Sequence, residues 1–567
     1  MAADRTNDHT PFNLLDEPWI PVLGLDGQVS DQSLLTLVRD ADRAASIVGD
    51  LPTQSFAILR LMLAILHRSL RRPDGGAGPA DVATWRSLGS DPDLMAARAT
   101  TYLNVFRDRF DLFHPEQPFF QVADLATGKG EVSGLDKLIA DVPNGAPFFT
   151  TRIGPGIECI TAAEAARWLV HVHAFDPSGI RSGDPRDHRV KNGKGYPIGT
   201  GWTGQVGGVF LEGRSLRETL LLNLGVWADA ASVIHSGADD LPPWERTQLG
   251  PTEEEPGRLP RGPVDLYTWQ SRRVRLVGDR ERITGVVLCQ GDKVTPQNTW
   301  RWEPMTAWRH SKPQSAKLGR PTYMPAQHDP SRAFWRGLEA LLTQAVPPAD
   351  SGPRGEPAPR LAPAVICWTR ILREDDVLPP DTLIPVHAVG LAYGTQNAIV
   401  EELVDDVIRL PAVLFDDGHP ELAHTALDAV KAADDVAQAA ANLRQNLARA
   451  AGMGGDESEH PREAGRAELY HALDHAFRDW VTRLGQDDAI TATSRWQETV
   501  RRIARDLTDD WLDACGPAAL IGRSVNGRRL DAGLAHQWFL SKLGQALPYA
   551  HHTTIRVEIT LEEEELA

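Results

Sequence analysis

Residues 421–450 read ELAHTALDAVKAADDVAQAAANLRQNLARA, an alanine- and leucine-rich stretch without an internal proline or glycine. Such a composition favours one long helix. Three further segments with apolar residues at helical spacing follow it, at about residues 462–484, 493–514 and 532–547. The connections between them are short to moderate, which favours antiparallel neighbours. The sequence therefore predicts an all-α C-terminal four-helix bundle.

The chain before the bundle has a different texture, with short apolar runs, single helices and many Gly and Pro turns. At 567 residues the chain exceeds the roughly 250 to 300 residues at which single cores stop growing. We expect an α+β fold with a large, irregular mixed domain over residues 1–416 and the bundle over 417–567. Within the first domain, residues 55–70 predict a buried helix, and RRVRLVGD (272–279) and AVICWTRIL (364–372) predict strands.

The overall charge excludes a protein that binds nucleic acid by general basicity. Lys and Arg number 59 against 77 Asp and Glu, a net charge of -18, so any such contact is expected to be local. The cysteines, at 159, 289, 367 and 515, lie too far apart to suggest a disulfide framework or a zinc knuckle. With no signal-peptide pattern and no apolar run long enough for a membrane span, we expect a cytoplasmic chain without a membrane role.

Motifs for catalysis are missing from the sequence. It contains no phosphate-cradling G-x-x-x-x-G-K-[ST], no G-x-S-x-G and no H-E-x-x-H, so ATPase, esterase and zincin activities have little support. His171 and His173 would lie on one face of a strand, and His551 and His552 are adjacent, but neither pair has an obvious acidic or cysteine partner. We expect structural or surface histidines and neither a metal nor a cofactor.

Two stretches are locally basic. Residues 181–195 carry five Lys or Arg against two Asp, in a Gly-rich segment expected to lack regular structure. Residues 271–320 carry 11 Lys or Arg against four acids, a local net charge of +7, with Trp300, Trp302 and Trp308 among them. Cations neutralise phosphates and indoles stack on bases, which suits a nucleic-acid surface. An edge strand with an outward basic face, beside core tryptophans, is weighted equally.

The block FNLLDEPWIPV, residues 12–22, predicts an N-terminal strand that packs into the core. It also resembles the N-terminal signature of the CasA family, the large subunit of the type I-E CRISPR surveillance complex Cascade. The resemblance continues in order through five further motifs: HPEQPFFQ (114–121), LDKLIADVPNGAPFF (135–149), LRETLLLN (216–223), CWTRIL (367–372) and GLAYGTQNAIVEE (390–402).

Membership of this family implies a non-catalytic target-recognition subunit. Such a protein recognises the protospacer-adjacent motif on double-stranded DNA, promotes duplex opening and R-loop formation, and recruits the helicase-nuclease. The implied partners are the CRISPR guide RNA, double-stranded target DNA, the backbone and small subunits of Cascade, and the type I helicase-nuclease. Two alternatives from other classes stay open: a metal-dependent nucleic-acid hydrolase, and a purely structural scaffold subunit.

The resemblance also implies roles for particular residues. Phe149, or else Phe148, stands where the family contacts the guide RNA handle. The family's motif-reading glycine loop corresponds to Asn192, Gly193, Lys194 and Gly195, and its lysine finger aligns best with Lys293. The family's strand-separating wedge is a glutamine after Trp and Thr, whereas Arg370 follows Trp368 and Thr369 here. Each role has a structural alternative. Phe149 or Phe148 would be a core residue, the glycine loop a flexible surface insertion, and Arg370 a cation at the end of a strand.

Overall fold

The structure is a computed structural model that describes residues 11–72, 74–142, 150, 152, 155–227, 234–342, 357–525 and 527–550. The described residues divide into two compact units. Unit 1 holds the chain up to residue 332, the described part of 343–368, and 385–407. Unit 2 holds 333–342, 369–384 and the chain from 408 onward. Three stretches that precede residue 416 thus belong to unit 2, residues 333–342, 369–384 and 408–415, and the expected domain boundary at 416 stays a prediction.

The N-terminal strand forms as the sequence indicates. β1 (Ile20–Gly24) is the central strand of an antiparallel sheet with β2 (Val29–Gln32) and β3 (Ala44–Ile47). Trp19, immediately before β1, is fully buried and donates a 3.0 Å hydrogen bond to the Leu14 carbonyl. The block at residues 12–22 therefore packs into the core of unit 1, as the sequence predicts.

The predicted buried helix is the central element of unit 1. α2 (Pro52–Ser69) packs against α4 (Pro92–Val105), α6 (Ala162–Phe175), α7 (Leu216–Asn223) and α8 (Pro263–Tyr267). Arg60 of this helix is buried and forms a bidentate pair with the buried Glu303 at 2.7 and 2.8 Å. A buried cation is tolerated here because its charge and donors are matched.

The remaining elements of unit 1 are strands in small sheets and short helices. β7 (Arg272–Gly278) pairs with β8 (Ile283–Gln290) as an antiparallel hairpin. A second sheet has the order β10 (Tyr323–Pro325), β9 (Trp308–His310), β11 (Arg360–Leu361), and a third has β13 (Val400–Pro411), β12 (Leu383–Tyr393), β6 (Gly208–Leu211). The other helices are α1 (Leu34–Arg39), α3 (Val82–Ser90), α5 (Pro155–Glu158) and α9 (Lys312–Leu318).

Two predicted strands are helices. Residues 364–372 lie in α11 (Ala364–Glu374), whose buried positions include 365, 368, 369 and 372, the spacing of one helix face. A short apolar run does not by its pattern distinguish a buried strand from a buried helix.

His171 and His173 lie in α6, where both are buried. His171 is 3.0 Å from the Thr53 hydroxyl and His173 is 2.9 Å from the Phe120 carbonyl oxygen, and burial lowers the pKa of each to about 3. They are core histidines, as expected, on a helix rather than a strand.

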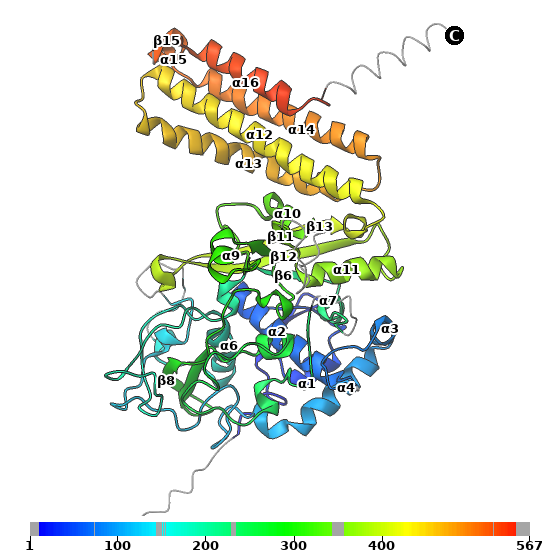
Figure 1. Cartoon of the computed structure of the whole chain (residues 1–567), viewed down its shortest axis with the longest axis vertical. Coiled ribbons are helices and arrows are strands. Elements are labelled where there is room, and N and C mark those ends of the chain that lie inside the picture. The colour runs from blue at the N-terminus through cyan, green and yellow to red at the C-terminus, as the bar shows by residue number, and fades with distance from the viewer. Residues whose placement is uncertain are drawn as a thin grey trace, which may run out of the picture. The chain divides into compact units, whose positions relative to one another are not determined.

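Unit 2 contains long helices at the four C-terminal segments for which the sequence predicts them (Figure 1). They are α12 (Pro420–Ala451), α13 (Glu459–Val481), α14 (Ala489–Asp513) and α16 (Ala532–Ala546). α12 packs against each of the other three. The short α15 (Pro517–Ile521) and the hairpin of β14 (Arg523–Val525) and β15 (Arg528–Leu530) precede α16, and α10 (Glu339–Leu342) belongs to the same unit. The whole chain is of mixed α+β class.

Candidate nucleic-acid interface

Residues 181–195 form a β-hairpin rather than an irregular loop. β4 (Arg181–Ser182) pairs antiparallel with β5 (Lys194–Gly195), and the backbones of Lys191 and Lys194 exchange two 3.0 Å hydrogen bonds. Between them, Asn192 and Gly193 have φ of 53° and 74°. A two-residue turn with positive φ at both positions is the one that Asn-Gly favours, because its twist matches the strands. The Gly-rich, polar composition of the segment predicts no regular structure, but the preference of Asn-Gly for this turn favours a hairpin.

Ion pairs order the segment between β4 and the tip of this hairpin and fix its first residue. Arg186 pairs with Asp184 at 2.7 Å and Arg189 with Asp187 at 2.8 Å. Burial would raise the pKa of Asp184, but hydrogen bonds from the Arg186 side chain and from backbone amides lower it to about 2. Arg181 pairs with the buried Asp176 at 2.5 Å. Three of the five cations in the segment are therefore structural.

The tip of the hairpin carries the remaining two cations. Lys191, Asn192, Gly193 and Lys194 are exposed, and only Gly195 is buried. No described carboxylate lies within 4.0 Å of the Lys191 or Lys194 ammonium group. The tip thus presents two cations and one amide to solvent on a narrow turn. Lys191 is a residue that the sequence interpretation missed, although the Asn-Gly dipeptide between two lysines could have indicated it.

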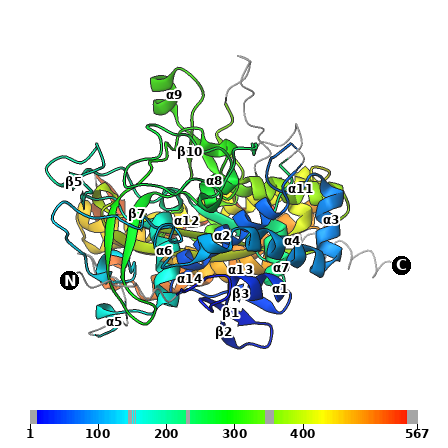
Figure 2. The ribbon, with the colours of Figure 1, turned by 90° about the horizontal axis from the view of Figure 1, so that it is seen from below.

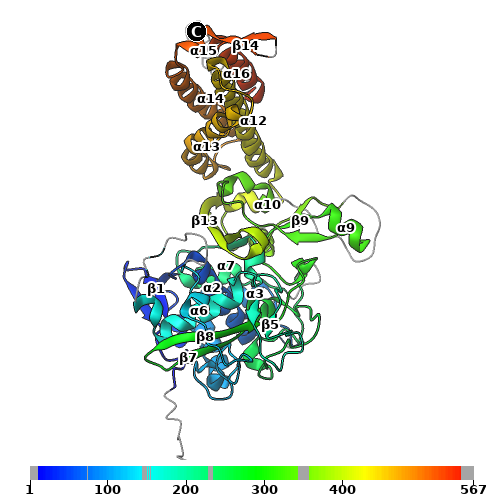
Figure 3. The same ribbon diagram turned by 90° about the vertical axis from the view of Figure 1, so that its left-hand side faces the viewer.

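The hairpin is attached to the end of β8, close to Lys293. Arg189 donates to the backbone oxygens of Gln290 and Gly291 at 3.3 and 2.8 Å. The Gln290 side chain donates to the Gly179 carbonyl at 2.8 Å, and β4 packs against β8. Figures 2 and 3 show β5, the partner strand of β4, on the side of unit 1 that carries the β7–β8 hairpin. Lys293 follows β8 by three residues and is exposed. The structure therefore brings together the two segments to which the sequence assigned motif reading.

The basic strand 272–275 faces inward, which contradicts its expected outward basic face. Arg272 is fully buried; it pairs with Asp176 at 2.5 Å and donates to several carbonyls, among them that of Gly199 at 2.8 Å. Arg273 is buried as well and pairs with Asp292 at 3.0 Å. Only Arg275 is partly exposed. A guanidinium can be buried in a sheet because its five donors find carbonyl and carboxylate acceptors.

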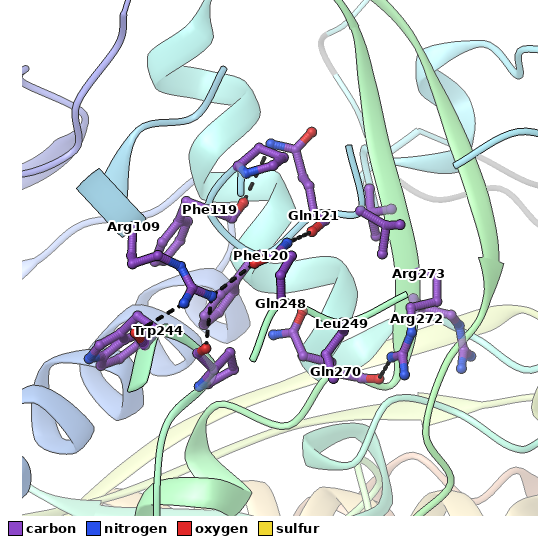
Figure 4. A pocket seen from close by; sticks show the side chains of 14 residues that line it. Arg109, Phe119, Phe120, Gln121, Trp244, Gln248, Leu249, Gln270, Arg272 and Arg273 are labelled. Carbon is purple, nitrogen blue, oxygen red and sulfur yellow. Dashed lines mark hydrogen bonds between the residues drawn. The ribbon is translucent and has the colours of Figure 1, made fainter. Parts of the chain in front are cut away.

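A small cavity lies beside this strand, and its arginines are also bound by the protein itself (Figure 4). Arg109 lines it together with Arg272 and Arg273, and donates to the carbonyls of Pro243 and Arg246 and to Gln248 Oε1 at 2.8 to 3.0 Å. The cavity has a volume of about 20 Å³, room for about one water molecule. Its arginines are therefore held by backbone, amide and carboxylate oxygens of the protein itself.

The tryptophans of the basic stretch belong to the core. Trp300 and Trp308 are buried in one cluster with Trp202 and Trp269, and Trp302 packs against that cluster. The core alternative for these residues is confirmed, and none of the buried rings can stack on a base.

Arg370 lies on helix α11 in unit 2, so its interpretation as a strand-end residue is wrong. Its side chain is 19% exposed, pairs with Asp417 at 2.9 Å and donates to the Phe415 carbonyl at 3.3 Å. The preceding Trp368 and Thr369 are buried. The role of Arg370 as a wedge stays a prediction.

Several expectations concern residues outside the described ranges. Phe148 and Phe149 are among these, as are His551 and His552. Within the described ranges, no three His, Cys, Asp or Glu side chains gather as a metal site would require. The same residues contain no helix that is long and apolar enough to span a membrane.

Comparisons with known proteins agree on one family. Residues 13–507 match the family model described as CRISPR-associated protein Cse1. A CRISPR-associated protein CasA/Cse1 of Thermus thermophilus is 31% identical over 516 residues, which cover 87% of this chain and 91% of the relative. The crystal structure of Thermobifida fusca Cse1 matches with a TM-score of 0.85 at 40% identity, over 95% of this chain and 99% of the other. A chain of a CRISPR RNA-guided surveillance complex shares the fold, with a TM-score of 0.67 at 18% identity over 94% and 99% of the two chains.

Proposed function

Because this chain belongs to the CRISPR-associated protein Cse1 family, we propose that it is the large, non-catalytic target-recognition subunit of a type I-E Cascade complex. The related chain of a CRISPR RNA-guided surveillance complex, which shares its fold, supports this assignment. In the proposed complex, guide RNA pairing reads the target sequence, and the protein reads only a short duplex motif. An acidic protein with a small cationic surface at the hairpin tip suits that division.

The exposed hairpin tip, on a segment that contacts the end of β8 shortly before Lys293, carries this proposal. Lys191, Lys194 and Lys293 would neutralise phosphates, while the Asn192 amide would contact a base edge in the minor groove. A two-residue turn is narrow enough to approach that groove closely. Ion pairs within residues 184–189 and the hydrogen bonds of Arg189 to the end of β8 order the segment that precedes the tip. The tip is therefore preorganised, which reduces the entropy lost on binding.

The other parts of the function follow from the same premise. Arg370 would separate the first target base pair, since a guanidinium can stack on an exposed base or pair with phosphate. Phe149, or Phe148, would stack on the handle of the guide RNA. The long helices of unit 2 would form a four-helix bundle against the small subunit, and the assembled complex would recruit the helicase-nuclease once the R-loop has formed.

Duplex binding and strand opening by guide-loaded Cascade, with and without this chain, test the proposal. The targets should differ only in the short flanking motif. We expect motif-dependent opening that requires this chain and weakens when Lys293 is changed to Gln. The exposed Lys317 of α9, changed to Gln, is the matched control and should leave opening unchanged.

Two results would favour the alternatives. If target binding survives neutralisation of Lys194 and Lys293 and does not depend on the motif, the chain acts as a scaffold. If the isolated chain cleaves nucleic acid and a chelator abolishes the cleavage, it is a metal-dependent hydrolase.

A further inference from the structure

A cavity of about 260 Å³ lies in unit 1, apart from the hairpin and Lys293. It opens between the start of α2, the segment after β3, helix α7, and the strands β6, β12 and β13. Its volume is slightly below the roughly 300 Å³ at which drug-sized sites begin. The space therefore suits a fragment of about one ring and a short chain.

Most of the cavity wall is apolar. Phe56 and Phe210 stack with their ring centroids 5.8 Å apart, and Leu59 and Val389 line the wall beside them. Phe210 is only half-buried, so its ring is accessible from the opening. Apolar surface of this kind gains free energy when a ligand removes it from water.

Two carboxylates are among the polar groups that line the cavity. Glu212 and Asp405 line it with His387, and the His387 ring lies 2.9 Å from a Glu212 carboxylate oxygen and stacks on Phe210 at 4.5 Å. No described residue forms a hydrogen bond or ion pair with the Asp405 carboxylate. The described residues that line the cavity include no Lys or Arg.

Asp405 is exposed at the edge of the cavity, and a carboxylate in that position beside an apolar wall selects one class of ligand. Desolvation raises the pKa of Asp405, His387 opposes that shift, and the neighbouring Asp406 adds to it. A cation placed beside Asp405 would stabilise its ionised form, whereas an anion would be repelled by both carboxylates.

We propose that this cavity binds an amphipathic cation, an amine or guanidinium joined to an apolar body of fragment size. Its apolar part would lie against Phe56, Leu59 and Phe210, and its charged group would pair with Asp405 and Glu212. Such chemistry occurs in free arylalkylamines and in the arginine side chain of a partner protein. The site goes beyond target recognition and does not depend on that function.

Calorimetric titration of the full chain with three probes of similar shape tests the proposal. 2-Phenylethylamine is cationic, 2-phenylethanol is neutral and 3-phenylpropionate is anionic. We expect the amine to bind at least tenfold more tightly than the alcohol, and the acid not to bind. Nα-acetyl-arginine amide, titrated separately, represents a protein side chain, and whichever cation binds more tightly identifies the source. Equal affinity for the three probes, or no binding of either cation, would overturn the proposal.

Variants of lining residues test which carboxylate binds the cationic group of the probe and whether the probe occupies the cavity. Asp405→Asn breaks no hydrogen bond within the described residues and should weaken amine binding severalfold while leaving the alcohol unaffected. Asp406→Asn is the matched control, because adjacent residues of a strand point to opposite faces. Ser46→Phe, at another lining position, should block both probes. Unchanged amine binding in Asp405→Asn, or in Ser46→Phe, would contradict the assignment.

Discussion

The hairpin of residues 181–195 and the strand of residues 272–275 are both basic in sequence, but the fold uses them in opposite ways. At the hairpin tip, Lys191 and Lys194 are exposed. In the strand, Arg272 and Arg273 are buried, where they bind carboxylates and carbonyls. A local excess of positive charge therefore does not by itself define a surface. The guanidinium supplies a planar set of donors that a protein interior can satisfy, whereas a compact, strongly hydrated ammonium stays in water.

Removal of a buried cation tests this contrast most severely. Arg272→Met should lower the free energy of unfolding of unit 1 by about 1 to 3 kcal/mol, because it removes one of the two arginines that pair with the buried Asp176 and leaves the Gly199 carbonyl without this donor. The midpoint of urea denaturation of the full chain, followed by tryptophan fluorescence, measures this. Arg282→Met removes an exposed arginine from the turn of the same β7–β8 hairpin and should change the value by no more than about 0.5 kcal/mol. Equal midpoints for the two variants would show that burial does not distinguish these arginines.

Removing exposed cations should affect binding and leave stability unchanged. Lys194→Gln with Lys293→Gln should weaken duplex binding by the guide-loaded complex and reduce the slope of log K against log salt by about two, one for each phosphate that is no longer neutralised. A salt titration measures the slope. The double variant Lys312→Gln with Lys317→Gln removes the same charge from α9, within the same basic stretch, and should keep the original slope. An unchanged slope in the first variant would remove the lysines from the interface.

The turn that presents the lysines can be tested by its backbone. Gly193→Ala places a Cβ at a φ of 74°, which costs about 1 to 2 kcal/mol for an L-residue. No atom lies within 4 Å of that Cβ, so the cost is conformational. Hydrogen exchange at the Lys191 and Lys194 amides should accelerate about 5- to 30-fold. Gly179→Ala, also in open space but without a positive φ, should leave those rates unchanged, and slow exchange in Gly193→Ala would argue against this turn.

Arg370 lies between the two extremes, since it is partly buried and paired with Asp417. Arg370→Gln should change stability by about 1 kcal/mol or less, yet it should slow strand opening by the complex without weakening motif binding. Fluorescence of a base analogue at the first target pair reports the opening. Asp417→Asn removes the same ion pair and keeps the arginine, so it should open the duplex at the normal rate. Slow opening in both variants would point to the ion pair rather than to a wedge.

Much of the helical architecture was predictable from local pattern. The segment expected at 421–450 is α12 (Pro420–Ala451), and the one expected at 532–547 is α16 (Ala532–Ala546). Long amphipathic periods repeat a signal over many residues, so a single misplaced residue does not change the prediction. The short run at 364–372 spans only about two helical turns, so its pattern predicts a strand where the structure has helix α11.

Within the candidate interface, the residue types were predictable and their environments were not. Family resemblance indicates Asn192–Gly195 and Lys293 from the sequence. The sequence does not indicate that the three arginines of the hairpin segment pair with aspartates: Arg186 and Arg189 with aspartates of the same segment, and Arg181 with Asp176 just before it. Nor did it distinguish Trp300 in the core from a stacking residue. These outcomes depend on partners that are distant along the chain.

The family, the α+β class, the long C-terminal helices and the Asn-Gly dipeptide of the turn could all be identified in the sequence, because each depends on residues close together in the chain or on a motif that can be matched directly. Which cations are available to a partner depended instead on the folded chain. The Asp176 carboxylate accepts a hydrogen bond from Arg272, which lies 96 positions further along the chain. The exposure of Lys293 depends on where strand β8 ends beside the hairpin of residues 181–195. Burial is a property of all the neighbours of a side chain, and most of those neighbours come from elsewhere in the sequence.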